Sequence, residues 1–161
     1  MAKLYFSYST MNAGKSTLLL QASYNYRERG MRTLLYTSAL YAKGNGVTGL
    51  IESRIGISAE AELFRDGDDL FDRIREETLT GKVDCVFVDE AQFLTEAQVW
   101  QLARVADRLG IPIMAFGLRV DFQGNLFPGS KALLAIADSL REIRTICYCG
   151  TKATMVVRKD E

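Results

Sequence analysis

Hydrophobic and polar positions alternate along the chain between two patterns, one typical of buried strands and one typical of helices. Short apolar runs predict strands at residues 4–8, 32–37, 83–88, 112–117 and 141–147, with 155–157 pairing beside the last of them. Helical spacing predicts helices at residues 14–29, 70–78, 95–109 and 131–138. Because strands that alternate with helices favour right-handed crossovers, we expect an α/β fold with a mainly parallel sheet and helices on both faces.

Local signals mark several boundaries in this pattern. Gly30 is expected to end the first helix. Thr95, with Gln98 three positions later, predicts a capping box at the start of a helix. Residues 38–57 contain four glycines and little periodicity, which predicts a long mobile loop. Loops of this length are usually functional or disordered.

Composition limits the classes of function that need to be considered. A chain of 161 residues fits one domain with a proper core. Its 20 basic and 20 acidic residues give no net charge, which does not favour a nucleic-acid partner. No apolar run approaches the ~20 residues of a membrane-spanning helix, and the first residues do not resemble a signal peptide. We therefore expect a cytoplasmic protein that binds neither nucleic acid nor a membrane.

The chain contains three cysteines and no histidine. An odd number of cysteines argues against a disulfide scaffold, and Cys85, in the middle of a predicted strand, is expected to be a buried core thiol. The lack of histidine excludes Ser-His-Asp and Cys-His catalysis within this chain, and His-ligated metal sites as well. Any general base must therefore be a carboxylate, a lysine, a tyrosine or a cysteine.

The segment at residues 9–16 follows a predicted strand and opens a predicted helix. It matches the phosphate-loop pattern G-x-x-x-x-G-K-[ST] except at its first position, where Ser9 replaces glycine. In such loops backbone N–H groups surround the phosphates, the lysine reaches the β- and γ-phosphates, and the serine hydroxyl binds Mg²⁺. The candidate ATP-binding residues are Ser9, Thr10, Met11, Asn12, Ala13, Gly14, Lys15 and Ser16. The alternative is a chance Gly-Lys-Ser-Thr at the start of an ordinary helix.

Two acidic residues follow the predicted strand at residues 83–88. Ligands of parallel sheets bind beyond the carboxyl ends of the strands, where the phosphate loop also lies. Asp89 is therefore a candidate Mg²⁺ ligand together with Ser16, and Glu90 is a candidate general base for a hydroxyl group or water. A solvated turn or a helix cap is the alternative for this pair.

Three segments together resemble the type II thymidine kinases: residues 9–17, 88–93 and 117–127. The resemblance extends from about residue 2 to residue 158 and is weakest across 38–52. It implies a P-loop NTPase (RecA-like) fold that uses ATP and Mg²⁺. The implied reaction transfers the γ-phosphoryl group of ATP to the 5′-hydroxyl of thymidine, in pyrimidine salvage for DNA synthesis. It also implies a homotetramer.

The resemblance assigns roles to individual residues. Glu90 matches the catalytic base, and Asp89, Glu90, Ala91 and Gln92 match a second ATP-binding segment. The positions that match the thymidine pocket are Met11, Phe93, Leu118, Phe122 and Phe127. Aromatic faces suit a planar base, and stacking contributes ~1–3 kcal/mol per base. Burial under loops is the alternative interpretation of Phe93 and Phe127.

Two segments depart from the family pattern. The family carries an Asp-x-Arg-like arrangement where this chain has only Lys43, and Arg54 is the candidate substitute. Cys147 and Cys149 match half of a structural zinc site, which needs four ligands. Family members supply the other ligands, and a lasso-like loop over thymidine, from a later segment that this sequence lacks. Without these ligands, Cys147 and Cys149 are expected to be free thiols or a weak zinc site that a partner completes. We therefore expect a kinase domain at 1–143 and the start of a truncated zinc/lasso subdomain at 144–161.

Two other functions remain as alternatives. In a P-loop ATPase, Glu90 would activate water and the product would be phosphate alone. A catalytically weak ATP-binding protein without an acceptor-site lid would bind ATP and phosphorylate no nucleoside.

Overall fold

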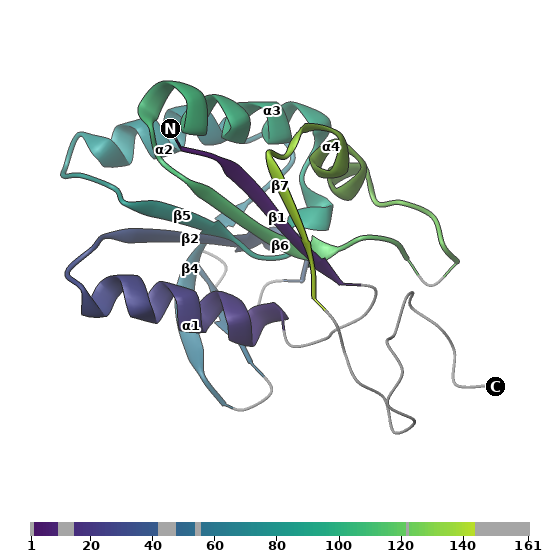
Figure 1. Ribbon diagram of the computed structural model, residues 1–161, viewed down its shortest axis with the longest axis horizontal. Coiled ribbons are helices and arrows are strands. Elements are labelled where there is room, and N and C mark those ends of the chain that lie inside the picture. Colours follow the sequence, from purple (N-terminus) through teal and green to yellow (C-terminus); the bar gives the residue numbers. More distant parts are fainter. Residues whose placement is uncertain (1, 10–14, 42–47, 54–55, 122, 144–161) are drawn as a thin grey trace.

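The computed structural model describes residues 2–9, 15–41, 48–53, 56–121 and 123–143. These form one seven-stranded sheet in the order β3-β4-β2-β5-β6-β1-β7 (Figure 1). The strands are β1 (Leu4–Ser9), β2 (Thr33–Ser38), β3 (Thr48–Glu52), β4 (Ser58–Phe64), β5 (Cys85–Val88), β6 (Ile113–Leu118) and β7 (Ser139–Glu142). All neighbouring strands pair in parallel except β3 and β4, which are antiparallel.

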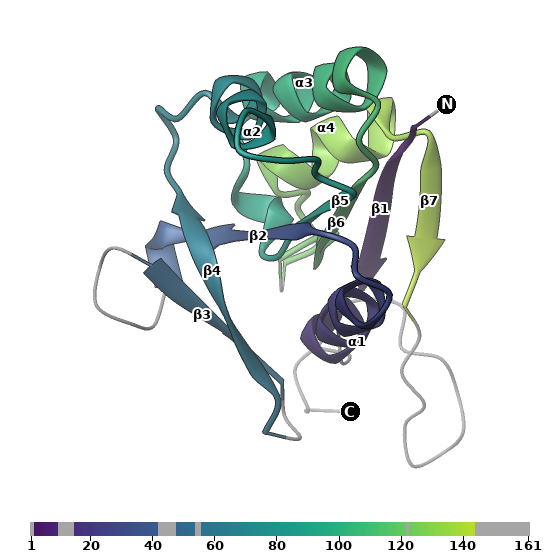
Figure 2. The same cartoon turned by 90° about the vertical axis from the view of Figure 1, so that its left-hand side faces the viewer.

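Helices cover both faces of this sheet. They are α1 (Lys15–Glu28), α2 (Leu70–Thr78), α3 (Glu96–Arg104) and α4 (Pro128–Ile136), with short 3₁₀ helices η1 (Ala39–Tyr41) and η2 (Ala91–Phe93). A π-helical turn, η3 (Val105–Leu109), continues α3. Helix α1 lies on one face, whereas α2, α3 and α4 lie on the other (Figure 2). The predicted mainly parallel α/β sheet with helices on both faces is confirmed.

Strand β5 shows why its sequence is apolar throughout. All four of its residues are buried, and successive side chains point to opposite faces. Val86 and Val88 pack in the cluster that α2, α3 and α4 cover, whereas Cys85 and Phe87 pack with Leu19 of α1. Cys85 is the buried core thiol that the sequence predicts, and burial raises its pKa to about 12.

The predicted helix boundaries are confirmed where a cap or a glycine marks them. Thr95 Oγ accepts a hydrogen bond from the Gln98 N–H, and the Gln98 side chain accepts one from the Thr95 N–H. Gly30 follows α1 with a φ of 76°, a conformation that glycine adopts readily. Helix α4 begins three residues earlier than predicted because Pro128 suits the first turn of a helix.

The prediction of one long loop over residues 38–57 is wrong. This segment contains η1 and β3, and β3 pairs with β4 from Thr48↔Glu62 to Glu52↔Ser58. The hairpin lies at the edge of the sheet, where Ile51 is buried but Leu50 is 37% exposed. Glycines and half-exposed positions therefore hid the strand pattern.

The last part of the chain limits two other predictions. Strand β7 begins two residues before the predicted start at Arg141, and residues 144–147 and 155–157 lie outside the described residues. The described part of the chain ends at residue 143, where the kinase domain is predicted to end. The zinc/lasso subdomain expected at residues 144–161 therefore stays a prediction. No helix within the described ranges is long and apolar enough to cross a membrane.

Candidate functional site

The candidate residues meet at one edge of the sheet, where parallel strands end together. Ser9 at the end of β1 pairs with Leu118 at the end of β6, and Val88 at the end of β5 pairs with Ala115 of the same strand β6. Helix α1 starts beyond β1, and Asp89 follows β5. Strand β6 separates β1 from β5 (Figure 1), so the sheet order brings together side chains that are far apart in sequence.

Lys15 links the two predicted motifs directly. Its Nζ lies 3.1 Å from Asp89 Oδ1 and 3.1 Å from Glu90 Oε1, and the residue is only 3% exposed. Burial by itself lowers the pKa of Lys15, but the two carboxylates outweigh it, so its pKa is raised. The ammonium group therefore stays charged, and it can form ion pairs with phosphate oxygens.

Ser16 and Asp89 place two oxygen donors side by side. Ser16 Oγ donates to Asp89 Oδ2 at 3.0 Å, and the Asp89 N–H donates to the Tyr36 carbonyl of β2. Hydroxyl and carboxylate oxygens suit Mg²⁺, so the pair fits this ion. Among the described residues, no group of three or more His, Cys, Asp or Glu side chains is placed to hold a metal ion. Mg²⁺ in proteins usually takes one or two carboxylates and completes its shell with substrate phosphates and water.

Glu90 has an unusual backbone conformation. Its φ of 55° and ψ of 40° make it the one non-glycine residue with positive φ in the described part of the chain. This left-handed conformation costs roughly 1–2 kcal/mol, and such strain is typical of functional sites. The Glu90 side chain is 31% exposed, so an incoming group can reach its carboxylate.

Three of the predicted thymidine-pocket residues lie beside this turn. The rings of Phe93 and Phe127 meet edge to face, with centroids 5.8 Å apart and planes at 74°. Leu118 ends β6, where its N–H donates to Gln92 Oε1 at 3.1 Å. All three pocket residues are half-buried, which leaves part of each surface available to a ligand.

The structure therefore brings together most of the predicted site residues that it describes. Ser9 is buried at the end of β1, and its carbonyl accepts the Arg119 N–H; Ala91 is also buried. The other predicted residues lie outside the described residues: Thr10, Met11, Asn12, Ala13, Gly14, Phe122, Cys147 and Cys149, together with Lys43 and Arg54.

Two glycines whose role no sequence motif indicates contribute to the site. A Cβ atom on Gly117 would lie 2.8 Å from Gln92 Oε1. A Cβ atom on Gly129 would overlap the Ala91 carbonyl and lie 2.8 Å from the Leu94 carbonyl. Glycine at both positions allows β6 and α4 to approach η2 closely. Gly117 is the last residue of a predicted strand, and Gly129 follows Pro128 shortly before a predicted helix; these places were the available signal.

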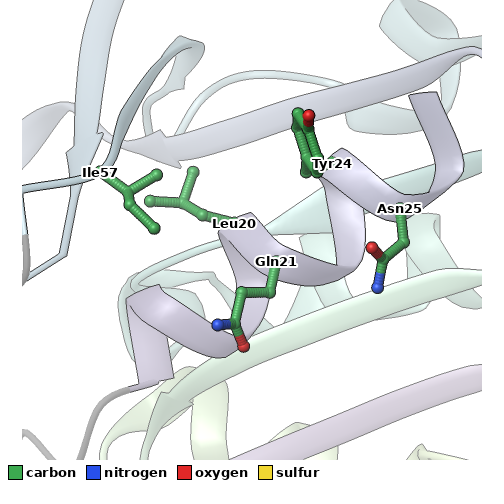
Figure 3. Close-up of a pocket in the computed structure, with 5 residues that line it drawn as sticks. All are labelled: Leu20, Gln21, Tyr24, Asn25 and Ile57. Carbon is green, nitrogen blue, oxygen red and sulfur yellow. The ribbon is translucent and has the colours of Figure 1, made fainter. Parts of the chain in front are cut away.

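A separate apolar pocket of about 330 Å³ lies between α1 and the start of β4 (Figure 3). Its lining comprises Leu20, Gln21, Tyr24, Asn25 and Ile57. None of these residues belongs to the predicted site. Tyr24 is 61% exposed, so the pocket opens broadly to solvent.

Comparison with known proteins gives a consistent result. The family described as "Thymidine kinase" matches residues 2–161. A thymidine kinase of Mesorhizobium japonicum is 71% identical over 158 residues, covering 98% of this chain and 77% of that protein. Thymidine kinases of Ruegeria pomeroyi and Agrobacterium fabrum are 67% and 64% identical over 160 residues, covering 99% of this chain and 80% and 82% of theirs. A solved structure titled "crystal structure of DNA replication initiation factor" has a TM-score of 0.46 at 19% identity, covering 89% of this chain and 40% of that one, too distant to support any argument.

Proposed function

The chain belongs to the thymidine kinase family, and on that premise we propose that it transfers the γ-phosphoryl group of ATP to the 5′-hydroxyl of thymidine. One observation carries this proposal. The buried Lys15 ammonium contacts both Asp89 and Glu90, so a phosphate-binding cation, a Mg²⁺ ligand and a carboxylate base lie together. Phosphoryl transfer requires this combination of positioning and charge stabilisation.

The reaction forms a bond between the thymidine 5′-oxygen and the γ-phosphorus of ATP. It breaks the bond between that phosphorus and the oxygen that bridges the β- and γ-phosphates. Lys15 stabilises the charge on the phosphate oxygens, because its ammonium is held beside Asp89 and Glu90, next to the phosphate-loop segment. Mg²⁺ held by Ser16 and Asp89 supplies further neutralisation of that charge when bound. Glu90 orients the 5′-hydroxyl and accepts its proton, and ADP and thymidine monophosphate leave.

The acceptor half of the site is proposed from its shape and chemistry. Phe93 and Phe127 offer aromatic surface at the end of the sheet, and Leu118 adds an aliphatic contact. A planar pyrimidine can stack on such a surface. Because Phe93 follows Glu90 in the same turn, a base held there places its sugar hydroxyl near the carboxylate.

A product assay tests the proposal. The purified chain, with Mg²⁺ and ATP, is offered thymidine and the other nucleosides, and nucleoside monophosphate and free phosphate are measured separately. We expect thymidine monophosphate and ADP to form in equal amounts. Phosphate that forms at the same rate with and without thymidine would indicate an ATPase instead. ATP binding without any product would indicate a catalytically weak ATP-binding protein.

Further expectations from the resemblance remain proposals. These are a homotetramer, a cytoplasmic location, and an incomplete zinc site at Cys147 and Cys149, for which free thiols are the alternative. Sedimentation tests the first: a monomer at assay concentrations would contradict it. Metal analysis of the purified protein tests the zinc expectation, which fails if no zinc co-purifies.

A further inference from the structure

Gln92 is a buried polar side chain that links the proposed base to the thymidine pocket. It lies in η2 and is 2% exposed. Its Nε2 donates to Glu90 Oε2 at 2.5 Å, and its Oε1 accepts from the Leu118 N–H at 3.1 Å. Both polar groups of the amide therefore form hydrogen bonds, one with the proposed base and one with the backbone of Leu118 at the end of β6.

The orientation of this amide follows from the chemistry of its partners. A backbone N–H can only donate a hydrogen bond, so the Leu118 N–H must face the amide oxygen. The amide NH₂ group then faces the Glu90 carboxylate, which accepts. Reversing the amide would place a donor against a donor and two oxygens against each other, so one arrangement is strongly favoured.

The backbone around Gln92 leaves this side chain little freedom. Gly117 lies against the Gln92 side chain. A Cβ atom on Gly117 would lie 2.8 Å from the side-chain amide oxygen of Gln92 and 2.9 Å from its backbone nitrogen. On the other side, a Cβ atom on Gly129 would lie 2.9 Å from the Gln92 carbonyl. Strand β6 and helix α4 thus hold η2 between them, and the amide is fixed in place.

The two oxygens of Glu90 have different partners. Oε1 faces the Lys15 ammonium at 3.1 Å, whereas Oε2 faces the neutral amide of Gln92. When Lys15 turns to phosphate oxygens, Gln92 is the contact that continues to hold the carboxylate. Its hydrogen bond is charge-assisted, which makes it stronger than one between neutral groups.

We propose that Gln92 is a positioning residue: it holds Glu90 Oε2 so that Glu90 Oε1 faces the acceptor hydroxyl. Through its bond to Leu118, Gln92 also fixes the position of the Glu90 carboxylate relative to the thymidine pocket. This inference rests on the proposed function. Gln92 does not touch the reacting atoms itself, and it acts through Glu90. It therefore affects the rate of transfer more than the binding of either substrate.

Two substitutions separate the two ends of the amide. Gln92→Glu keeps an oxygen for the Leu118 N–H but replaces the donor that faces Glu90 with a second carboxylate oxygen. Gln92→Leu removes both hydrogen bonds. Gln21→Leu, at an exposed position of α1, is the matched control. We expect both Gln92 variants to lower kcat about 10- to 100-fold, the value of a hydrogen bond to a charged group, with KM for thymidine and ATP within about 3-fold.

A double substitution shows whether Gln92 acts through Glu90. In the Glu90→Gln background, Gln92→Glu should lower the remaining rate by less than about 2-fold, because the group it positions is already gone. An equal loss in both backgrounds would overturn the proposal. So would a folded Gln92→Glu variant with unchanged kcat, or one whose loss lies wholly in KM. If the unsubstituted chain phosphorylates thymidine and the Gln92 variants match it, only the positioning role fails; if it makes no monophosphate, the proposed function fails first.

Discussion

At the scale of single residues, the site depends on its charge balance. Lys15 brings one positive charge between the two negative charges of Asp89 and Glu90, which leaves a net charge of −1. A polyphosphate would be repelled by this cluster without a further cation, so we expect the proposed site to need Mg²⁺ together with ATP. Loss of Lys15 would make the net charge −2 and leave Asp89 buried without its ion pair.

Lys15→Ala should therefore abolish nucleotide binding and lower the stability of the fold. We expect the melting temperature to fall, since breaking a buried ion pair costs on the order of 3 kcal/mol. We also expect that Mg²⁺-ATP no longer raises the melting temperature, because stabilisation by a ligand depends on its affinity for the folded protein. Lys82→Ala, whose side chain is 87% exposed, is the control and should keep full protection. Unchanged protection in Lys15→Ala would contradict the assignment of the phosphate site.

At the scale of elements, the site is built by the close contact of η2 with β6 and α4. Glycine is required where α4 begins, since a side chain at Gly129 would overlap three carbonyl oxygens from the η2 turn. Phe127 precedes α4 and Phe93 ends η2, so this contact also sets the distance between the two rings. A shift of α4 would disturb the proposed thymidine pocket and the fold together.

Gly129→Ala should separate α4 from η2. We expect a loss of about 1–3 kcal/mol in the free energy of unfolding, because overpacking forces backbone shifts, and a rise in KM for thymidine. Denaturant unfolding and steady-state kinetics measure the two effects. Gly67→Ala is the matched control, since a Cβ atom there meets nothing within 4 Å. Equal stability of the two variants would show that the contact is not tight.

The sequence predicts elements that depend on local signals. The apolar run of β5 and the capping box at Thr95 were visible because neighbouring residues determine them. The β3–β4 hairpin was missed, since its half-exposed edge strand and glycines weaken the alternation. The Gln92–Leu118 contact joins residues 26 positions apart, and the left-handed φ of Glu90 belongs to a residue type that seldom adopts it. Neither has a local pattern.

At the scale of the whole molecule, the sheet places the proposed donor and acceptor halves of the site on adjoining strand ends. Strand β1 leads to Lys15 and β5 leads to Glu90. Strand β6 lies between β1 and β5 and ends at Leu118. The parallel strands bring all three to one edge, and helices cover both faces of the sheet (Figure 2). We propose that this edge is a phosphotransfer site in which Glu90 is the base.

Glu90→Gln tests this claim most directly. The substitution keeps the size of the side chain but removes its ability to accept a proton, so binding and chemistry can be separated. Thymidine monophosphate formation and Mg²⁺-ATP affinity are measured for this variant and for Glu60→Gln, an exposed position of β4. We predict a fall in kcat of about 10²- to 10⁴-fold, the usual contribution of a general base, with ATP affinity within about 3-fold. A rate close to that of the unsubstituted chain would contradict the assignment of Glu90 as the base.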